Sequence, residues 1–99
     1  MSFVITQPEM LAAAVAHLQS MGSAMSVQNA AAAAPITGVV PAAADEVSAL
    51  TAARFALHAQ MYQAVSAQAE AIHQLFVSTL GTSATSYAAT EVANAIAAG

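Results

Sequence analysis

The sequence predicts an all-α protein, an antiparallel two-helix hairpin in a single domain of 99 residues. The first reason is the run Val47–Leu80, 34 residues without Gly or Pro in which apolar residues recur every three or four positions. The second is an earlier run with the same spacing. The third is the segment between them, which Pro35, Gly38 and Pro41 interrupt. Short connections between long helices imply antiparallel neighbours.

The first helix is expected from about residue 8 to residue 34. Thr6 and Glu9 have the spacing of a capping box, with Thr6 as N-cap, and Pro8 is tolerated in a first turn. On local chemistry alone, these are the features of an ordinary helix start. Gly22 and the methionines Met21 and Met25 in mid-helix suggest an adaptable contact at close approach, although core gap-filling is the commoner explanation of both. The apolar positions are Leu11, Ala14, Val15, Leu18, Met21, Gly22, Met25 and Ala32.

A turn is expected over residues 35–41 and a second helix over about 42–80, with Asp45 and Glu46 in or near its first turn, where the helix dipole favours acids. This helix carries two apolar stripes in different registers. The first stripe is Val47, Leu50, Leu57, Met61, Ala64, Ala71 and Leu75, and the second stripe is Phe55, Tyr62, Val65, Ala69, Ile72, Phe76 and Leu80. Together they cover more than the arc of about 100° that one neighbour needs, so two neighbours are expected.

One stripe should therefore pack on the first helix and much of the other on a second molecule. The remaining sector, expected to face water, contains Gln60, Gln63, Ala67, Glu70 and Gln74. Beyond it, residues 81–99 form a tail, in which Gly81 and the Ser/Thr residues after it should stop or bend the helix. Tyr87 and Glu91 would share a face if this tail is helical. The alternative is a frayed end in which neither residue has a role.

Composition points to a partner and away from several functions. Hydrophobic residues make up 59% of the chain, but 29 residues are alanine, which buries little area. An isolated hairpin should therefore be marginally stable. A net charge of −4 with one basic residue, Arg54, argues against nucleic acid and anionic membranes as partners. Polar residues, prolines and Gly38 argue against a transmembrane span, and residues 1–9 lack the basic region of a cleaved signal peptide.

No catalytic, cofactor-binding or metal site is expected, nor a small-molecule substrate. The chain has no Cys, and His17, His58 and Glu70 are too scattered to specify a metal. Glu70 and His73 have the spacing of a solvated pair on one helix face. An enzyme is not expected, because no nucleophile elbow, phosphate-binding loop or carboxylate pair is present.

Four features together resemble the PE family of mycobacteria: the opening Met1, Ser2, Phe3, Val4; Pro8 and Glu9; an Ala-rich two-helix body; and Tyr87-x-x-x-Glu91. The resemblance covers residues 1–99 as one PE domain. Some members carry a glycine-rich or lipase region after this domain. The sequence ends at Gly99, so it resembles the short form and neither activity is expected of it.

The resemblance implies a function. A PE domain pairs 1:1 with a PPE protein in an elongated four-helix bundle, to which it contributes two helices, and a type VII (ESX) secretion system exports the pair. The Tyr-x-x-x-acid element is the secretion signal and lies beside a Trp-x-Gly turn of the partner. An EspG-type chaperone binds the pair in the cytosol through the PPE protein before the pair is secreted or displayed at the cell surface. Pro8 and Glu9 would be the family signature, and Tyr87 and Glu91 the signal.

The resemblance and the stripes together place the partner interface on apolar residues of both helices. These are Leu11, Leu18, Met25, Leu50, Phe55, Leu57, Met61, Tyr62, Val65, Ile72 and Phe76. Arg54 is expected to extend along the border of this contact, with an interchain ion pair as the alternative. Two other functions stay open at this point: a self-assembling homodimeric bundle and a membrane-active amphipathic effector. The sequence does not identify the ESX system or the PPE partner.

Overall fold

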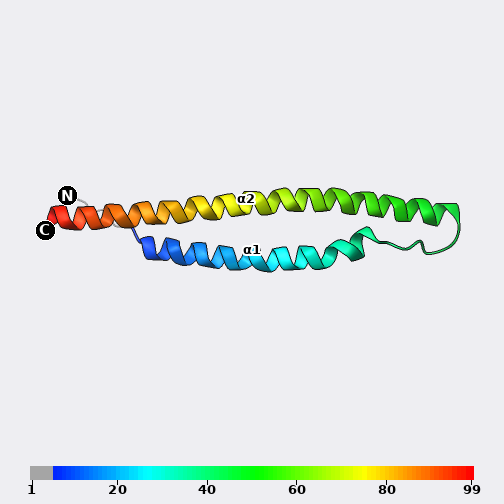
Figure 1. The fold of residues 1–99 in the computed structure, drawn as a ribbon, viewed down its shortest axis with the longest axis horizontal. Coiled ribbons are helices and arrows are strands. Elements are labelled where there is room, and N and C mark those ends of the chain that lie inside the picture. Colours follow the sequence, from blue (N-terminus) through cyan, green and yellow to red (C-terminus); the bar gives the residue numbers. More distant parts are fainter. Residues whose placement is uncertain (1–5) are drawn as a thin grey trace. The chain divides into compact units, whose positions relative to one another are not determined.

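The computed structural model describes residues 6–99, so the opening tetrapeptide lies outside the described part. Within it are two helices, α1 (Pro8–Thr37) and α2 (Glu46–Ala98), and no strand. The predicted all-α fold is confirmed. The chain divides into two compact units: unit 1 combines the residues up to Gly22 with His73–Gly99, and unit 2 is Ser23–Ile72. Within each unit, a segment of α1 lies antiparallel to a segment of α2 (Figure 1).

The start of α1 differs from the predicted capping box. The carbonyl of Gln7 accepts the amides of Met10 at 3.0 Å and Leu11 at 3.3 Å, so Gln7 is the N-cap. Thr6 lies one residue earlier, and its hydroxyl bonds to another part of the chain. The prediction that Thr6 caps the helix is therefore wrong. Pro8 takes the first helical position, where the missing amide has no intrahelical acceptor to lose.

The end of α1 lies three residues beyond the predicted end, because Pro35 does not stop the helix. Proline has no amide to donate, but so close to the end it removes only one bond of the ladder. Thr37 then donates its hydroxyl to the carbonyl of Ala33 at 2.6 Å, and the Gly38 amide donates to Ala34 at 3.0 Å. The first bond adds a side-chain donor to the last turn, and the second closes that turn on the Ala34 carbonyl.

The second helix begins at Glu46 rather than near residue 42. Asp45 is its N-cap: the Ser48 amide donates to Oδ1 at 2.7 Å and the Ser48 hydroxyl to Oδ2 at 3.2 Å. The bond from the Ser48 amide is the main reason that the pKa of Asp45 lies below its ordinary value. A cap at Asp45 fixes the helix start there and leaves the alanines before it outside the helix.

The predicted stop at Gly81 is wrong, because α2 continues without interruption to Ala98. Gly81 has no positive φ, and a Cβ built on it would lie 3.8 Å from Cγ1 of Val15 in α1. The glycine therefore sits where the two helices approach each other. Thr82 and Thr85 donate their hydroxyls to the carbonyls of Ser78 and Gly81, one turn back, so these polar side chains are satisfied inside the helix.

The face of α2 that packs toward α1, here called the seam, lies in a third register that neither predicted stripe occupies. Its members in unit 2 are Ser48, Ala52, Ala56, Ala59, Gln63, Ser66 and Glu70, and in unit 1 His73, Val77, Gly81, Ala84, Ala88 and Glu91. Four of them are buried: Ala52, Ala59, Val77 and Ala84. The prediction that one stripe packs on the first helix is wrong, and so is the expectation that Gln63 and Glu70 face water.

Small side chains explain this arrangement. A seam of alanine, serine and glycine lets two helix backbones come close along their length, whereas Phe, Tyr and Met would hold them apart. On α1 the matching half-buried positions include Leu11, Val15, Leu18 and Gly22, as the spacing predicted. Three other predicted positions, Ala14, Met21 and Met25, are exposed instead. The larger apolar side chains of α2 are left on its outer surface.

Candidate functional site

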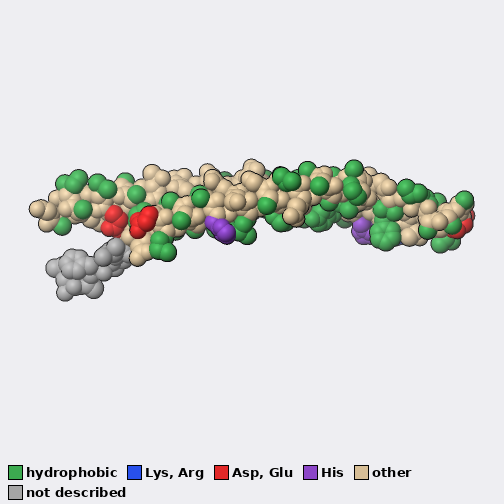
Figure 2. Space-filling model, turned by 90° about the horizontal axis from the view of Figure 1, so that it is seen from below, with side chains coloured by type: hydrophobic (Ala, Val, Ile, Leu, Met, Phe, Trp, Pro, Cys, Tyr) green, Lys and Arg blue, Asp and Glu red, His purple; other side chains and the backbone are tan. Residues whose placement is uncertain are grey.

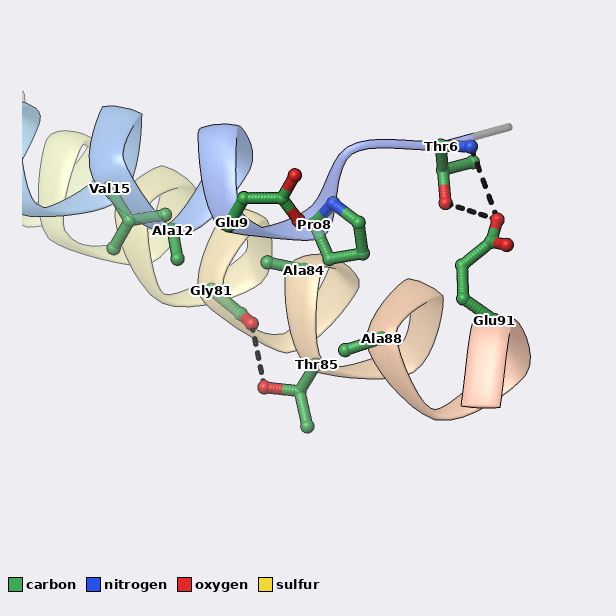
Figure 3. Close-up of a pocket in the computed structure, with 10 residues that line it drawn as sticks. All are labelled: Thr6, Pro8, Glu9, Ala12, Val15, Gly81, Ala84, Thr85, Ala88 and Glu91. Carbon is green, nitrogen blue, oxygen red and sulfur yellow. Dashed lines mark hydrogen bonds between the residues drawn. The ribbon is translucent and has the colours of Figure 1, made fainter. Parts of the chain in front are cut away.

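One end of unit 1 contains an open hollow between the start of α1 and the last turns of α2 (Figure 3). Both helices contribute to it, and so does Thr6, which precedes α1. The lining residues are Thr6, Pro8, Glu9, Ala12, Val15, Gly81, Ala84, Thr85, Ala88 and Glu91. The structure thus brings three of the four predicted signature and signal residues, Pro8, Glu9 and Glu91, to one place.

Glu91 is hydrogen-bonded by Thr6, which lies near the opposite end of the sequence. Its Oε1 accepts the backbone amide of Thr6 at 3.1 Å and the Thr6 hydroxyl at 2.6 Å. Both bonds are visible in Figure 3. Donors that bond a carboxylate favour its charged form, so the Thr6 hydroxyl first, and then its amide, hold the pKa of Glu91 below the ordinary range. Glu91 is therefore an ionised, doubly hydrogen-bonded group and not part of a frayed end.

Tyr87 lies one helical turn before Glu91 on the uninterrupted α2. Spacing of four places both side chains on one side of the helix. Glu91 is half-buried toward α1, whereas Tyr87 is 47% exposed. The sequence could predict this pairing only on the condition that the tail is helical. The structure meets that condition.

Pro8 and Glu9 have different surroundings in the same hollow. Pro8 is half-buried, and Glu9 is exposed in the first turn of α1, where the helix dipole favours an acid. The hollow therefore has two carboxylates on its lining, one on each helix. Its floor is made mostly of alanine, valine and glycine.

A second candidate site is the outer surface of α2, where the members of both predicted stripes are exposed except Leu80, which is half-buried. In unit 2, Phe55 is 60% and Ile72 is 68% exposed, and in unit 1 Phe76 is 56% exposed. Figure 2 views the molecule from the side of α1, and hydrophobic side chains recur along the face that it shows, while the outer surface of α2 faces away. The exposed members of the predicted interface are Met25, Leu50, Phe55, Leu57, Met61, Tyr62, Val65, Ile72 and Phe76. Large exposed apolar patches mark sites of interaction.

Leu11 and Leu18, the other two predicted interface residues, are half-buried in α1. They share the register of Val15, which faces Gly81 of α2. The carbonyl of Leu18 also accepts Nε2 of His73 at 2.9 Å. These two leucines thus contribute to the packing of unit 1 as well as to the surface at its border.

Polar bonds cross the seam inside each unit. In unit 2, Asn29 donates to Oε1 of Glu70 at 3.0 Å, and the Tyr62 hydroxyl donates to Asn29 Oδ1 at 3.4 Å. In unit 1, the His73 ring lies against Gly22, where an added Cβ would come within 2.7 Å of Nε2. Glu70 and His73 each bond to α1, so the predicted solvated pair is wrong. At Gly22 the structure shows the close approach, which the sequence offered beside the commoner explanation of gap-filling.

Residues 6–99 contain no cluster of His, Cys, Asp or Glu that could bind a metal ion. Nor does either helix, in the described part of the chain, offer an apolar stretch long enough to cross a membrane. Arg54, the one basic residue, is exposed.

Sequence reasoning missed Thr6 as a partner of Glu91. The two residues are 85 positions apart, and no local pattern joins them. The available clue was that Thr6 and Glu91 lie near opposite ends of the sequence, and an antiparallel hairpin brings such segments together. The local capping pattern around Thr6 concealed that clue.

The sequence matches the profile described as "PE family" over residues 4–94. It is 71% identical to PE family protein PE13 of Mycobacterium tuberculosis, over 99% of both chains. It is 57% identical to PE family protein PE8 and to PE-PGRS family protein PE_PGRS1 of the same organism. The matched regions are 36% and 19% of those two longer proteins. The names of these relatives describe no enzymatic activity.

Proposed function

The chain belongs to the PE family, and from that membership we propose that it is a non-enzymatic binding subunit exported as half of a heterodimer. Its partner is a PPE protein, bound 1:1, and the transporter is a type VII (ESX) secretion system. An EspG-type chaperone binds the pair in the cytosol through the PPE subunit. The exported pair is secreted or stays at the cell surface.

The observation that carries the proposal is the distribution of side-chain size around α2. The buried members of its seam are three alanines and a valine, while Leu50, Phe55 and Met61 in unit 2 are each more than half exposed. Full burial of one such side chain contributes about 1.5–3 kcal/mol. A partner that covers these residues would therefore gain much more apolar burial than the hairpin gains within itself.

Two helices from a partner suit this surface best. An exposed row that follows a helical repeat of three and four residues accepts another helix in its grooves. Two such rows flank the seam, so two further helices complete a four-helix bundle. A second copy of this chain would offer the same geometry, and a homodimer is therefore the competing proposal.

The secretion signal in this proposal is Tyr87 and Glu91. Tyr87 offers an exposed aromatic ring, and Glu91 an ionised carboxylate whose orientation is fixed. Such a pair suits recognition by a protein with an apolar pocket and a donor next to it. Glu91 has the same charge as the Asp found in many family members.

Co-expression tests the partner. The tagged chain is purified from its own host, the co-purifying protein is identified, and the two are produced together and separately. The proposal expects a 1:1 complex with a PPE protein and poor solubility of the chain alone. A chain that forms a stable homodimer alone, and does not bind the co-purified protein, would establish the competing proposal instead.

Export tests the signal separately. Tyr87→Ala and Glu91→Ala should leave the heterodimer intact and abolish its appearance outside the cell, measured by immunoblot of culture filtrate and cell pellet. Exposed Thr90→Ala, on the same turns of α2, is the matched control and should be exported normally. Normal export of both signal variants would refute the role of this element.

A further inference from the structure

We propose that Thr6 is a positioning residue of the secretion signal, so that the signal is a composite of the two ends of the folded chain. The inference rests on the proposed function and adds a residue from outside the Tyr-x-x-x-Glu element. Thr6 acts through Glu91: its amide and hydroxyl fix one carboxylate oxygen in place.

The geometry supports a positioning role rather than a general packing role. Thr6 contributes two donors to the same atom, Oε1 of Glu91, at 3.1 and 2.6 Å. Two bonds to one oxygen restrict the carboxylate far more than a single bond from a flexible side chain. Hydrogen bonds to an ionised acceptor are also the stronger kind. Few other polar side chains line the hollow, so few alternative hydrogen bonds are open to the Glu91 carboxylate.

The hollow contains a useful comparison within the same chain. Thr85 also lines it, but its hydroxyl donates to the Gly81 carbonyl at 3.1 Å inside α2 (Figure 3). Glu9, the other carboxylate on the lining, lies on α1 in its first turn. Thr6 is therefore the threonine of the hollow whose hydroxyl reaches Glu91, and Thr85 is a threonine of the same place that does not.

This contact makes the signal depend on the fold. An isolated peptide containing Tyr87 and Glu91 has the same two side chains but lacks Thr6. In the folded hairpin the carboxylate is held at a set angle to the helix that presents Tyr87. A receptor that matches this arrangement would bind the folded chain better than the unfolded one.

The test uses the full chain with its co-purified partner and compares Thr6→Val, Thr6→Ser and Thr85→Val. Thr6→Val removes the hydroxyl and keeps the shape, while Thr6→Ser keeps the hydroxyl. We expect Thr6→Val to form the heterodimer and to lose export to the level of Glu91→Ala. Thr6→Ser and Thr85→Val should be exported like the wild type.

A second readout reports the contact itself. Carbon-detected NMR titration of the Glu91 carboxyl in the purified complex should give a higher pKa in Thr6→Val, because the hydroxyl is the larger cause of the lowered value. Thr6→Ser and Thr85→Val should leave the pKa of Glu91 unchanged. A structural role for Thr6 without contact to Glu91 would not move this pKa.

Three results would overturn the inference: normal export of Thr6→Val, an unchanged Glu91 pKa in that variant, or loss of the heterodimer, which would assign Thr6 to folding. The proposed function fails differently, through normal export of Tyr87→Ala and Glu91→Ala. Normal export of Thr6→Val together with loss of export in Glu91→Ala would remove the positioning role and leave the signal standing.

Discussion

The two sides of α2 differ in the size of their side chains. On the seam, the buried residues are Ala52, Ala59, Val77 and Ala84. On the outer side, in each unit, large residues such as Phe55 and Phe76 are more than half exposed. An ordinary amphipathic helix has the reverse arrangement, with its largest apolar residues inside. The two helices thus pack through small side chains, and the larger apolar side chains of α2 are mostly exposed.

The seam and the outer side of α2 also differ in their polar contacts. Bonds that cross the seam, such as Asn29 to Glu70 and Leu18 to His73, join particular residues of the two helices. A one-turn slip of one helix along the other would break them. The seam therefore specifies register more than it supplies stability, whereas the outer surface offers apolar area without polar specificity.

The largest expected effect comes from placing a charge on the outer surface. Phe55→Asp should abolish binding of the partner, because truncating a buried aromatic anchor alone costs about 2 kcal/mol or more and the charge would be buried too. Calorimetry or a pull-down with the co-expressed partner measures it. Gln60→Asp, at an exposed polar position, is the control and should bind normally. Equal binding of both variants would mean that the outer surface is not the interface.

The next effect comes from enlarging the seam. Ala59→Leu should destabilise the protein by about 1–3 kcal/mol, because the close approach of the helices leaves no room for the larger side chain. Urea denaturation of the purified complex measures the change. Ala67→Leu, at an exposed alanine of the same helix, should lie within about 0.5 kcal/mol of the wild type. A neutral Ala59→Leu would show that the seam is loosely packed.

A smaller effect separates Gly81 of the seam from Gly22 of α1, which faces the seam. Gly81→Ala should stabilise α2 by about 0.5–1 kcal/mol, since its Cβ would meet Val15 at an ordinary distance of 3.8 Å. In Gly22→Ala the Cβ would displace the His73 ring and break its bond to Leu18, which offsets a helix gain of similar size, about 1 kcal/mol. Thermal unfolding should therefore rank Gly81→Ala above Gly22→Ala.

A double variant sharpens this comparison. In a His73→Ala background the ring is absent, and Gly22→Ala should then stabilise the helix as Gly81→Ala does. If Gly22→Ala changes stability by the same amount with and without His73, the contact between Gly22 and the His73 ring does not determine the cost of adding a Cβ at this position.

The smallest effect lies at the turn and depends on pH. The pKa of Asp45 is lowered in the folded chain. Its ionised carboxylate therefore contributes fully to the stability of the helix start above the ordinary carboxyl value of about 3.9, and this stability is lost as pH falls through the lower folded value. The protection of the Ser48 amide, measured against its intrinsic exchange rate at each pH, should therefore fall in acid. Asp45→Asn keeps a capping oxygen without a titrating group, so protection at Ser48 should show no such fall.

The sequence was sufficient to predict the fold class and most of the half-buried face of α1. Residues three and four positions apart lie on the same side of a helix, so the spacing of apolar residues indicates which side is covered. It failed on α2 for a physical reason. Three registers of that helix are apolar enough to be buried, and size alone suggested that Phe and Leu go inside. Which register faces α1 depends on backbone approach, which Ala52 and Ala59 allow and Phe55 does not.

The remaining differences are contacts between distant residues. Gly81 looks like a helix stop until Val15 is placed opposite it. Thr6 resembles an N-cap until the hairpin brings Glu91 beside it. In both cases the residue type and its neighbours predicted a common local role, a helix stop or an N-cap. The contact that the structure shows instead is with a residue more than 60 positions away in sequence.

The polar contacts also imply an order of folding. Asp45 and Ser48 are 3 residues apart, Asn29 and Glu70 are 41, Leu18 and His73 are 55, and Thr6 and Glu91 are 85. Each doubling of a loop adds about 0.6 kcal/mol to the entropy cost of closing it. We therefore expect the hairpin to close from its turn outward, with the Thr6–Glu91 contact the last to form and the first to open. A chain that presents this contact has already completed the rest of its fold.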